Sequence, residues 1–311
     1  MNEPRTTFRR DPVLVTGATG FIGRHVVARL RGEGTTPIGV TRSASMPDGV
    51  ATESADVTDR EQVARVFERA RPAAVVHLAA AIPDGSSDRS DRRCFEECVA
   101  GSLNVVEACG AAGIPLVHAS STAVYGQMTG ASPAHEDVLP APDSLYGAAK
   151  LAGDILTLEL EREHDLPACA LRISAPYGPG NPRPSVINHF IEAALGSEDL
   201  TVFGTGQRAQ DFTYVGDVVE AIWCALSSEA RGVFNVATGA PISMRELAEE
   251  VLRAIPDTGS RVVLTGQDDP QESHRALLDV RKAKDRLGWS AQVSLHDGIV
   301  ATADVMVAAR R

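Results

Sequence analysis

The strongest constraint on the fold comes from residues 13–30, VLVTGATGFIGRHVVARL, in which three glycines recur at intervals of three. An apolar run precedes the glycines and an amphipathic stretch follows them, which predicts a buried strand that turns directly into a helix. In such a turn, Gly17 lets the chain bend, Gly20 lets an anion approach the backbone, and Gly23 lets helix and strand pack closely.

The start of the predicted helix would present free N–H groups and the positive end of its dipole to a phosphate group. No Lys-Ser or Lys-Thr pair follows the glycines, so the segment does not match a nucleoside-triphosphate loop. A glycine-rich turn without a ligand is the alternative, but the strand–turn–helix context favours a dinucleotide. The predicted contacts to its phosphates are Gly17, Thr19, Gly20, Phe21 and Ile22.

Short apolar runs alternate with amphipathic stretches through the first half of the chain. The predicted buried strands are residues 12–17, 37–41, 73–80, 115–120 and 167–174. Between them, residues 58–70 have apolar positions at helical spacing, and Thr58 with Glu61 matches a capping box at the helix start. Strands that are apolar almost throughout and alternate with helices predict an α/β fold, a doubly wound parallel sheet of the Rossmann type.

The alternation loosens after residue 174, where SAPYGPGNPRP (174–184) marks a boundary or a loop. Helical patterns at 244–254 and 280–288 follow it, and we expect a smaller C-terminal substrate lobe there. The predicted division assigns residues 1–173 to a dinucleotide-binding domain, to which 209–238 return, and residues 174–208 and 239–311 to the substrate-binding lobe.

Composition excludes several classes of protein. The net charge of −11 argues against a nucleic-acid partner, because phosphate neutralisation needs clustered Lys and Arg. No apolar run reaches the roughly 18–20 residues of a membrane span, and the N-terminus lacks the apolar core of a secretory signal. The five cysteines are scattered apart from Cys94 and Cys98, which predicts no metal site and a reducing, cytoplasmic location.

The end of the second predicted strand bears on the choice of dinucleotide. An acidic residue at this position usually binds the ribose hydroxyls of NAD, but here the sequence is VTRSAS. Arg42 and Ser43 would suit the 2′-phosphate of NADP, so we expect NADP, with NAD as the alternative. Asp56, after the third strand, could accept a hydrogen bond from the adenine amino group or serve as a turn residue.

The segment LYGAAKLAG, residues 145–153, places Tyr146 and Lys150 four residues apart on one helix face. Only small residues separate them, so a ligand could approach the backbone closely. An ordinary amphipathic helix with a packed tyrosine and a solvated lysine would give the same pattern, and the pair alone does not decide between the two.

Several further motifs occur in a fixed order along the chain. They are DVTD (56–59), HLAA (77–80), SSTAVYG (120–126), YGAAK (146–150), LRISAPYGPG (171–180), DFTYVGDVVEAI (211–222), FNVATG (234–239) and KAKDRLGW (282–289). Together with the glycine pattern, this ordered set resembles the extended short-chain dehydrogenase/reductase family, in its nucleotide-sugar epimerase, dehydratase and ketoreductase branch. The resemblance spans about residues 12–300.

The resemblance implies roles for specific residues. Tyr146 would be the general acid/base, assisted by Lys150, because a nearby ammonium and an oxidised nicotinamide favour the phenolate form of a tyrosine. Lys150 would also hold the nicotinamide ribose, and Ser121 would hydrogen-bond the substrate oxygen. The further cofactor contacts implied are Asp56, Val57, Leu78, Ala79 and Ala80, and the implied substrate contacts are Ser121, Thr122, Tyr146, Arg208 and Arg275.

The departures from the family pattern narrow the chemistry. The 4,6-dehydratases of this branch have an Asp-Glu pair where Thr122 and Ala123 stand, which argues against dehydration. Cys98 and Ala175 replace residues that are often Asn in the family, and Gln210 replaces the Arg that commonly binds the nucleotide diphosphate. Arg208 and Arg275 remain as possible diphosphate partners.

The sequence thus favours an NADPH-dependent ketoreductase of a nucleotide-activated 4-keto-6-deoxyhexose, with hydride transfer at C4 and Tyr146 as the proton donor. The main alternative is an NAD-dependent nucleotide-sugar 4-epimerase. A reductase of small carbonyl compounds and a non-catalytic dinucleotide-sensing protein fit less well, because the chain has the sugar-branch motifs and all three catalytic residues. Helices near 91–112 and after Tyr146 resemble the dimer interface of the family, so we expect a homodimer.

Overall fold

The computed structural model describes residues 10–42, 46, 49–83, 87–182, 184–256 and 258–310. Ser43, one of the predicted cofactor contacts, lies outside the described residues. Within them, no helix is long and apolar enough to cross a membrane, and no group of three or more His, Cys, Asp or Glu side chains could hold a metal ion.

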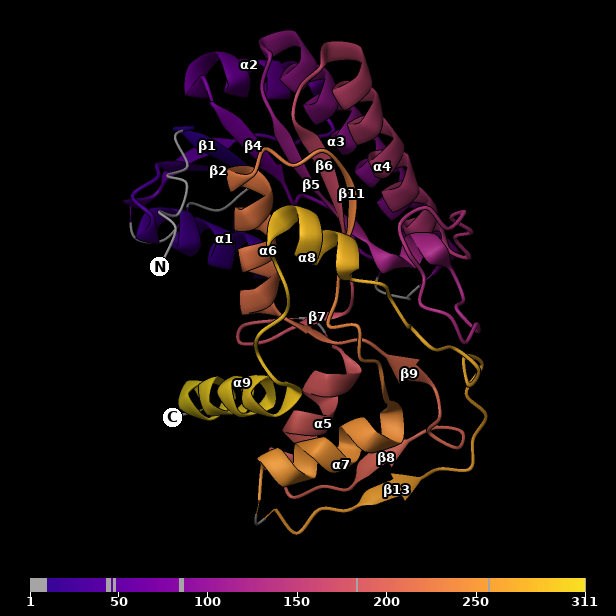
Figure 1. Ribbon diagram of the computed structural model, residues 1–311. Helices are drawn as coiled ribbons and strands as arrows, with labels where there is room; N and C mark the ends of the chain where they lie inside the picture. The colour runs from indigo at the N-terminus through magenta and orange to yellow at the C-terminus, as the bar shows by residue number, and fades with distance from the viewer. Residues whose placement is uncertain are drawn as a thin grey trace, which may run out of the picture.

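A seven-stranded sheet forms the centre of the larger part of the molecule (Figure 1). All its strands are parallel, in the order β11-β6-β5-β4-β1-β2-β3. Their bounds are β1 Val13–Thr16, β2 Pro37–Thr41, β3 Ala51–Ser54, β4 Ala74–His77, β5 Leu116–Ser121, β6 Ala168–Ile173 and β11 Gly232–Val236. The predicted doubly wound α/β fold is therefore confirmed.

Helices cover both faces of this sheet. One layer consists of α1 (Phe21–Gly32), α6 (Val215–Ser227) and α8 (Arg281–Leu287), and the other of α2 (Arg60–Ala70), α3 (Asp88–Ala112) and α4 (Leu145–His164). Because side chains alternate along a strand, Val13 and Val15 of β1 pack under the first layer and Leu14 under the second. Strands β1 and β4, in the middle of the sheet, are buried throughout for this reason, whereas the edge strand β3 is largely exposed.

The start of α2 differs from the prediction. The capping residue is Asp59, whose Oδ1 accepts from the Gln62 N–H at 3.0 Å, so the predicted capping box of Thr58 and Glu61 is wrong. Thr58 is unavailable as a cap because its N–H and its hydroxyl both donate to Asp56 Oδ1, at 2.9 and 2.8 Å. A short carboxylate turn therefore precedes the helix and moves its start one residue along the chain.

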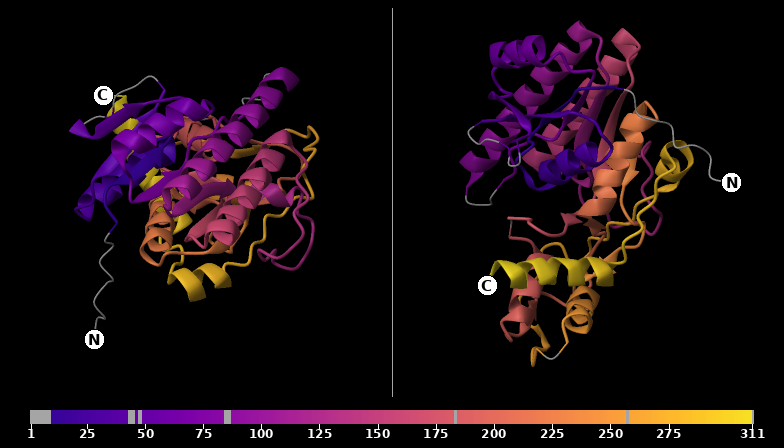
Figure 2. Two further views of the ribbon diagram at one scale, coloured as in Figure 1. Left: turned by 90° about the horizontal axis from the view of Figure 1, so that it is seen from above. Right: turned by 90° about the vertical axis from the view of Figure 1, so that its left-hand side faces the viewer.

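The smaller lobe lies beyond the carboxyl end of the sheet (Figures 1 and 2). Its elements are α5 Val186–Leu195, β8 Leu200–Val202, α7 Met244–Ala254, β13 Val262–Leu264 and α9 Leu295–Ala309, beside the two-residue strands β7 Pro176–Tyr177, β9 Ala209–Gln210, β10 Thr213–Tyr214 and β12 Ile242–Ser243. Phe190, Ile191, Leu247, Val251 and Ile299 form much of its separate core.

One part of the predicted lobe packs on the larger body. Ala283, Leu287 and Trp289, in and after α8, belong to the core under α1 and α6. Trp289 Nε1 donates to the Asp217 carbonyl at 2.9 Å, and the Asp217 carboxylate accepts from the Gln292 and Val293 N–H groups at 3.0 Å each. The chain thus returns to the body before it enters α9.

Candidate active site

The glycine-rich turn leaves no room for side chains at two of its positions. Gly17 has a φ of +66°, and a Cβ placed on it would lie 2.8 Å from the Ala79 nitrogen. A Cβ on Gly23 would lie 2.1 Å from the Gly17 carbonyl oxygen. Gly20 is the residue before α1 and offers no side-chain cap, so the first N–H groups of the helix stay open to an anion. This cradle fits the pyrophosphate of a dinucleotide.

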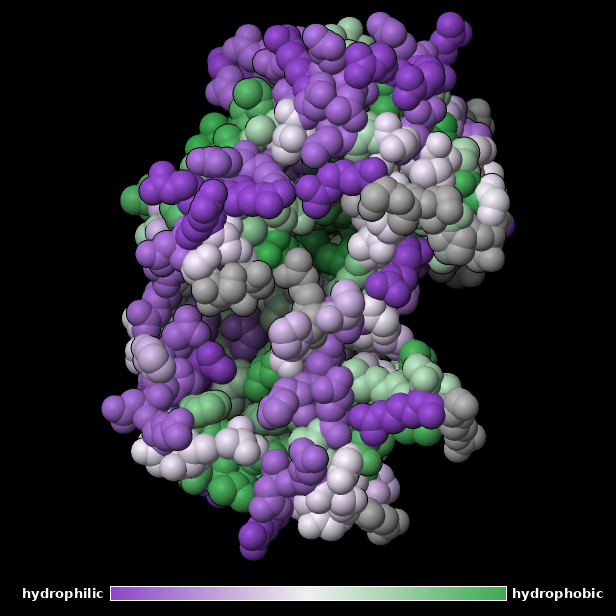
Figure 3. Space-filling model, turned by 180° about the vertical axis from the view of Figure 1, so that it is seen from behind, coloured by the Kyte–Doolittle hydropathy of each residue, from purple (hydrophilic) through white to green (hydrophobic). Residues whose placement is uncertain are grey.

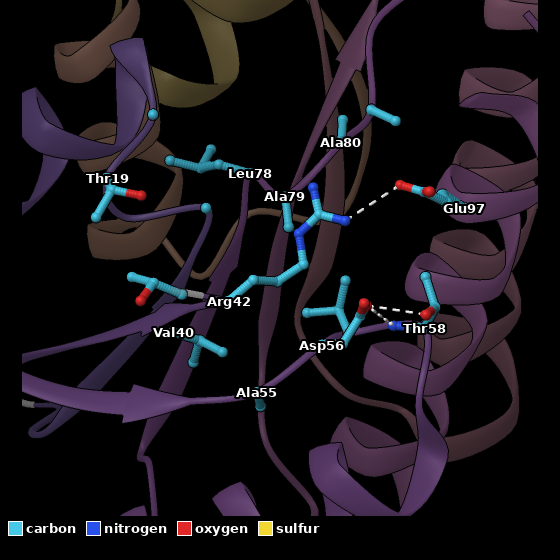
Figure 4. Close-up of a pocket in the computed structure, with 15 residues that line it drawn as sticks. Thr19, Val40, Arg42, Ala55, Asp56, Thr58, Leu78, Ala79, Ala80 and Glu97 are labelled. Atoms are coloured by element: carbon cyan, nitrogen blue, oxygen red, sulfur yellow. Dashed lines mark hydrogen bonds and ion pairs between the residues drawn. The ribbon is translucent and has the colours of Figure 1, made fainter. Parts of the chain in front are cut away.

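A cavity of about 290 Å³ opens beside this turn (Figure 4). Its lining residues are Gly17, Thr19, Gly20, Val40, Thr41, Arg42, Ala55, Asp56, Val57, Thr58, Leu78, Ala79, Ala80, Ala81 and Glu97. The structure thereby brings together most of the predicted cofactor contacts at the carboxyl ends of β1, β2, β3 and β4. Phe21 and Ile22 are not part of this lining; they begin α1 next to it.

Arg42 and Glu97 face each other across this cavity (Figure 4). Arg42 Nη1 lies 3.4 Å from Glu97 Oε2, and its side chain is 60% exposed. Glu97, on α3, also pairs with Arg93 at 2.6 Å. Glu97 was not predicted, because it is far from the strand ends in sequence. It places a carboxylate in the cavity where the second strand supplies none.

Thr16 and His77 fix the segment that lines this cavity after β4. Thr16 Oγ1 accepts from the N–H groups of Leu78 and Ala79 at 3.2 and 3.1 Å, so its own proton points to His77 Nδ1, 2.7 Å away. Burial lowers the pKa of His77 to about 3, and the ring is neutral at physiological pH. Apart from the HLAA motif (77–80), no sequence pattern indicates this contact.

The predicted catalytic residues lie on β5 and α4. Lys150 is 5% exposed, its Nζ donates to the Ala119 carbonyl at 3.0 Å, and this atom lies 5.8 Å from the centre of the Tyr146 ring. Ser121 ends β5, and its Oγ accepts from the Ala123 N–H at 3.2 Å at the start of the short helix η2 (Thr122–Tyr125).

The first turn of α4 packs closely on η2. A Cβ on Gly147 would lie 2.5 Å from the Ala123 carbonyl oxygen, and Ser144 caps α4 by accepting from the Gly147 N–H at 3.1 Å. The small residues between Tyr146 and Lys150 therefore serve the contact of α4 with the turn that carries Ser121. This answers why the tyrosine and the lysine are separated by small residues only.

A second cavity, of about 470 Å³, lies on the substrate side of this turn, and the molecular surface is hollowed between the two parts of the protein (Figure 3). Its lining residues are Ser121, Thr122, Ala123, Gly126, Met128, Asp143, Ser144, Ala175, Ser185, Val186, Arg208, Gln210, Phe212, Met244, Gln271 and His274. Ser121, Thr122 and Arg208 were predicted. Tyr146 is not in this lining but lies two residues after Ser144, which is.

Arg275 does not line the second cavity: it is exposed, and its neighbour His274 takes this place. His274 Nδ1 accepts from the Met128 N–H at 3.2 Å, so the ring proton is on Nε2 in the neutral form. Burial lowers the pKa of His274. Arg208 Nη1 donates to Gln271 Oε1 at 3.0 Å, and its Nε lies 3.2 Å from Asp269 Oδ2.

Pro179 and Gly180, which follow β7, contact the helix after the glycine turn. Arg24 Nη2 donates to the Gly180 carbonyl at 2.7 Å, and His25 Nε2 donates to the Pro179 carbonyl at 3.1 Å. Burial lowers the pKa of His25. Two residues of α1 thereby tie the loop between body and lobe to the cofactor side, a link between segments about 155 residues apart.

Comparisons with known proteins agree with this arrangement. A family model described as the NAD dependent epimerase/dehydratase family matches residues 13–237. Among curated proteins, the chain is 33% identical to a UDP-glucose 4-epimerase of Mycolicibacterium smegmatis, with 94% of this chain and 97% of that protein covered. It is 26% identical to a dTDP-4-dehydro-6-deoxyglucose reductase of Escherichia coli, with 94% and 96% covered.

Solved structures of nucleotide-sugar 4-epimerases are also similar to this chain. The UDP-glucose 4-epimerase of Thermotoga maritima with UDP-glucose has a TM-score of 0.89 at 29% identity, covering 96% of this chain and 100% of that chain. The UDP-glucose 4-epimerase of Thermus thermophilus in complex with NAD has a TM-score of 0.86 at 32% identity, covering 96% and 99%.

Proposed function

The chain belongs to the NAD dependent epimerase/dehydratase family, and from that premise we propose that it is a nucleotide-sugar 4-epimerase that uses NAD. The observation that carries the proposal is the position of the Lys150 ammonium, 5.8 Å from the centre of the Tyr146 ring and hydrogen-bonded to Ala119 of β5, the strand that ends at Ser121. The 33% identity to a UDP-glucose 4-epimerase over nearly the whole chain supports the same activity.

In this proposal, Tyr146, Lys150 and Ser121 have separate roles in the epimerisation. Tyr146 would take the proton from the C4 hydroxyl of the sugar and later return it. Lys150 favours the phenolate through its charge, and Ser121 would donate a hydrogen bond to the oxygen at C4. A bound nicotinamide dinucleotide would accept and return the hydride. Rotation of the keto sugar between the two transfers would invert C4, which requires a cavity with room for both orientations, and about 470 Å³ is available.

The ketoreductase of a nucleotide-activated 4-keto-6-deoxyhexose is the second candidate, and Arg42 favours it. An arginine at the end of β2 suits the 2′-phosphate of NADP. Glu97 favours the epimerase with NAD, because its carboxylate lies in the same cavity, pairs with Arg42 at 3.4 Å and would repel a 2′-phosphate.

A paired assay distinguishes the two functions. For a 4-epimerase, the purified protein should convert UDP-glucose to UDP-galactose with no added reductant, and the Tyr146→Phe variant should lose about 10²–10⁴-fold of this rate while it still binds the dinucleotide. Oxidation of NADPH only in the presence of a nucleotide-linked 4-keto-6-deoxyglucose would instead establish the reductase. Unchanged turnover in Tyr146→Phe would contradict both.

The cofactor preference has its own test. Replacing Glu97 with Gln should shift binding towards NADP, because the repulsive carboxylate is removed while Arg42 stays, whereas Arg42→Ala should weaken NADP more than NAD. Fluorescence titration with both dinucleotides measures the ratio of the two dissociation constants. If the ratio does not change in either variant, neither residue contributes to the discrimination between the 2′-phosphate of NADP and the 2′-hydroxyl of NAD.

We also propose that the protein forms a homodimer through α3 and α4. These helices lie side by side (Figure 2) and expose Leu103, Ile155 and Leu158, with exposed fractions of 39, 53 and 38%. Exposed apolar residues on adjacent helices are typical of an interface. Light scattering should give twice the chain mass, and Ile155→Lys should shift it to the monomer; a wild-type monomer would refute the proposal.

A further inference from the structure

A buried ion pair lies beneath the catalytic residues. Arg172 of β6 and Asp154 of α4 are 4% and 1% exposed, and Arg172 Nε lies 2.9 Å from Asp154 Oδ2. Withdrawing two charges from water is costly, and such a pair adds little stability compared with apolar side chains of the same volume. The proposed mechanism does not use either residue, so the pair calls for another explanation.

The position of the pair relative to Lys150 suggests one. Asp154 follows Lys150 by one helical turn, so both side chains point to the same side of α4, and the Lys150 charge acts on the pKa of the Asp154 carboxyl. Ser120 is the register partner of Arg172 in the sheet. His118 Nε2 is buried and has no hydrogen-bond partner among the described residues, whereas the Ser120 hydroxyl acts on the Asp154 carboxyl and opposes the rise of its pKa.

The pair also connects the catalytic helix to the wall of the second cavity. Arg172 Nη1 donates to the Tyr125 hydroxyl and to the Glu136 carbonyl, at 3.0 Å each. The Tyr125 hydroxyl in turn donates to Asn235 Oδ1 at 2.7 Å. Tyr125 ends η2, the short helix that begins after Ser121. Arg172 thus joins α4, η2 and the segment after Gly126 at one guanidinium.

We propose that Asp154 and Arg172 are positioning residues of the active site, which hold α4 and η2 in register and keep the charge around the Tyr146 phenol at the single positive charge of Lys150. This inference rests on the proposed roles of Tyr146 and Lys150. An apolar pair would also add no net charge, but it could not make the hydrogen bonds that fix the orientation of α4 and η2, whereas an ion pair makes these bonds and its opposite charges cancel.

The other groups around the pair leave this balance intact. Burial lowers the pKa of His77 on β4 to about 3 and lowers the pKa of His118 on β5, so both rings are neutral at physiological pH. Burial raises the pKa of Cys98 on α3 and of Tyr125 on η2, which are therefore neutral as well.

Two charged groups complete the set. Burial raises the pKa of the Asp154 carboxyl and the Arg172 guanidinium opposes that shift. Glu136, in the segment after η2, is half-buried, and its Oε1 accepts from the Asn235 N–H at 2.8 Å. Arg172 contacts the Glu136 backbone carbonyl through Nη1 and the Asp154 carboxylate of α4 through Nε.

Single neutral replacements should move the ionisation of Tyr146 in opposite directions. Asp154→Asn leaves Arg172 unbalanced, so the acid limb of the pH dependence of kcat should move to lower pH. Arg172→Gln leaves Asp154 unbalanced, and the limb should move to higher pH. Eight helical residues separate Asp154 from Tyr146 by about 12 Å. At an effective dielectric constant of about 20–40, this predicts shifts of about 0.5–1 pH unit.

A direct titration provides a second measurement. The chain has four tyrosines, so protein with ¹³C-labelled tyrosine in complex with NAD gives a simple spectrum in which Tyr146→Phe identifies one resonance. The titration midpoint of the Tyr146 resonance should move to lower pH in Asp154→Asn and to higher pH in Arg172→Gln, as the acid limb of kcat does. Tyr146→Phe itself must abolish turnover; if it does not, the proposed function fails, whereas wild-type chemistry with no opposite shifts overturns only this inference.

If a single variant does not fold, the double variant Asp154→Asn/Arg172→Gln still tests the proposal. Its charges balance again, so the midpoint should return to that of the wild type while kcat stays reduced about tenfold, because the fixed orientation is lost. Leu160→Ala, a buried apolar change on the same helix, serves as a control that lowers stability without moving the midpoint. Equal-sign shifts in the two single variants, a displaced midpoint in the double variant, or a shift in the control would overturn the proposal.

Discussion

The two cavities of the active site differ in the kind of residues that line them. The cofactor cavity is lined largely by backbone and small residues, such as Gly17, Gly20, Ala79 and Ala80, at the ends of parallel strands. The substrate cavity also has small residues in its lining, but Arg208, Gln271 and His274 add long polar side chains to it from the second half of the chain.

This difference separates what can change from what cannot. A backbone site depends on close contacts that an added side chain would break, so positions such as Gly17 and Gly23 are restricted to glycine. A side-chain site can change its preference by exchanging residues while the fold stays intact. We therefore expect changes on the cofactor side to cost stability, and changes on the substrate side to cost affinity.

The largest effect should follow from Gly23→Ala. Its Cβ would lie 2.1 Å from the Gly17 carbonyl oxygen, within the turn itself, so the free energy of unfolding should fall by about 3 kcal/mol or more and dinucleotide binding should be lost. Gly32→Ala, at the end of the same helix with no atom near its Cβ, is the control and should change stability by less than about 1 kcal/mol. Denaturant unfolding measures both; equal effects would contradict a backbone-built site.

Acid should destabilise the body more than the lobe. His77 and His118 are buried in the body, whereas His189 and His296 of the lobe are exposed. Because the folded pKa of His77 is about 3 against 6.5 for the free side chain, its contribution is complete above 6.5 and is lost as the pH falls towards 3. The slope should reach about 1.4 kcal/mol per pH unit for each buried histidine.

Replacing His118 with Gln should make this slope shallower, since one buried titrating ring is removed. Unfolding free energies of the two proteins between pH 7 and 4 would show it, and the exposed His296→Gln variant should keep the wild-type slope. A slope that is the same in all three proteins would place the acid sensitivity outside the buried histidines.

On the substrate side, Arg208→Ala and His274→Ala should each raise KM for the nucleotide sugar about 10-fold or more, because each removes a donor to an anionic or polar ligand. The dissociation constant for NAD should stay unchanged. Arg275→Ala is the matched control, since its side chain is exposed and outside the cavity lining. A larger effect for Arg275→Ala than for Arg208→Ala would show that, of the two arginines implied by the family resemblance, Arg275 is the one that binds the substrate.

The smallest effect concerns helix caps on the two sides. Ser243 begins α7 with a complete capping box to Glu246, and Asp59 caps α2. Replacing either by Ala should cost about 1 kcal/mol of stability. Only Ser243→Ala should also raise KM, because Met244 at the start of α7 lines the substrate cavity. Thermal unfolding measures the stability change and steady-state kinetics measures KM. A change of KM in Asp59→Ala would contradict the expected difference between the cofactor side and the substrate side.

The sequence was sufficient for five of the seven strands of the parallel sheet and for the turn beside it, whereas the bounds of β3 and β11 were not predicted. The strand at 37–41 was predicted with the observed bounds, the strand at 115–120 is shifted by one residue, and those at 12–17, 73–80 and 167–174 are longer than the observed strands by two to four residues. Their signals are local, because a strand covered on both faces must be apolar and a glycine must stand where no Cβ fits. The start of α2 was predicted wrongly for a local reason too. The Thr58 N–H donates to the Asp56 carboxylate, and the Gln62 N–H donates to Asp59, which caps the helix in place of Thr58.

Contacts between distant segments were decided by the tertiary structure alone. Glu97 reaches Arg42 from another element, Arg172 reaches Asp154 across the boundary of sheet and helix, and His274 takes the place expected for Arg275. In each case the side chain's chemistry is visible in the sequence, but its partner depends on how separate elements pack. Local order is encoded in neighbouring residues, whereas charge pairing in a site depends on distances that only the folded chain sets.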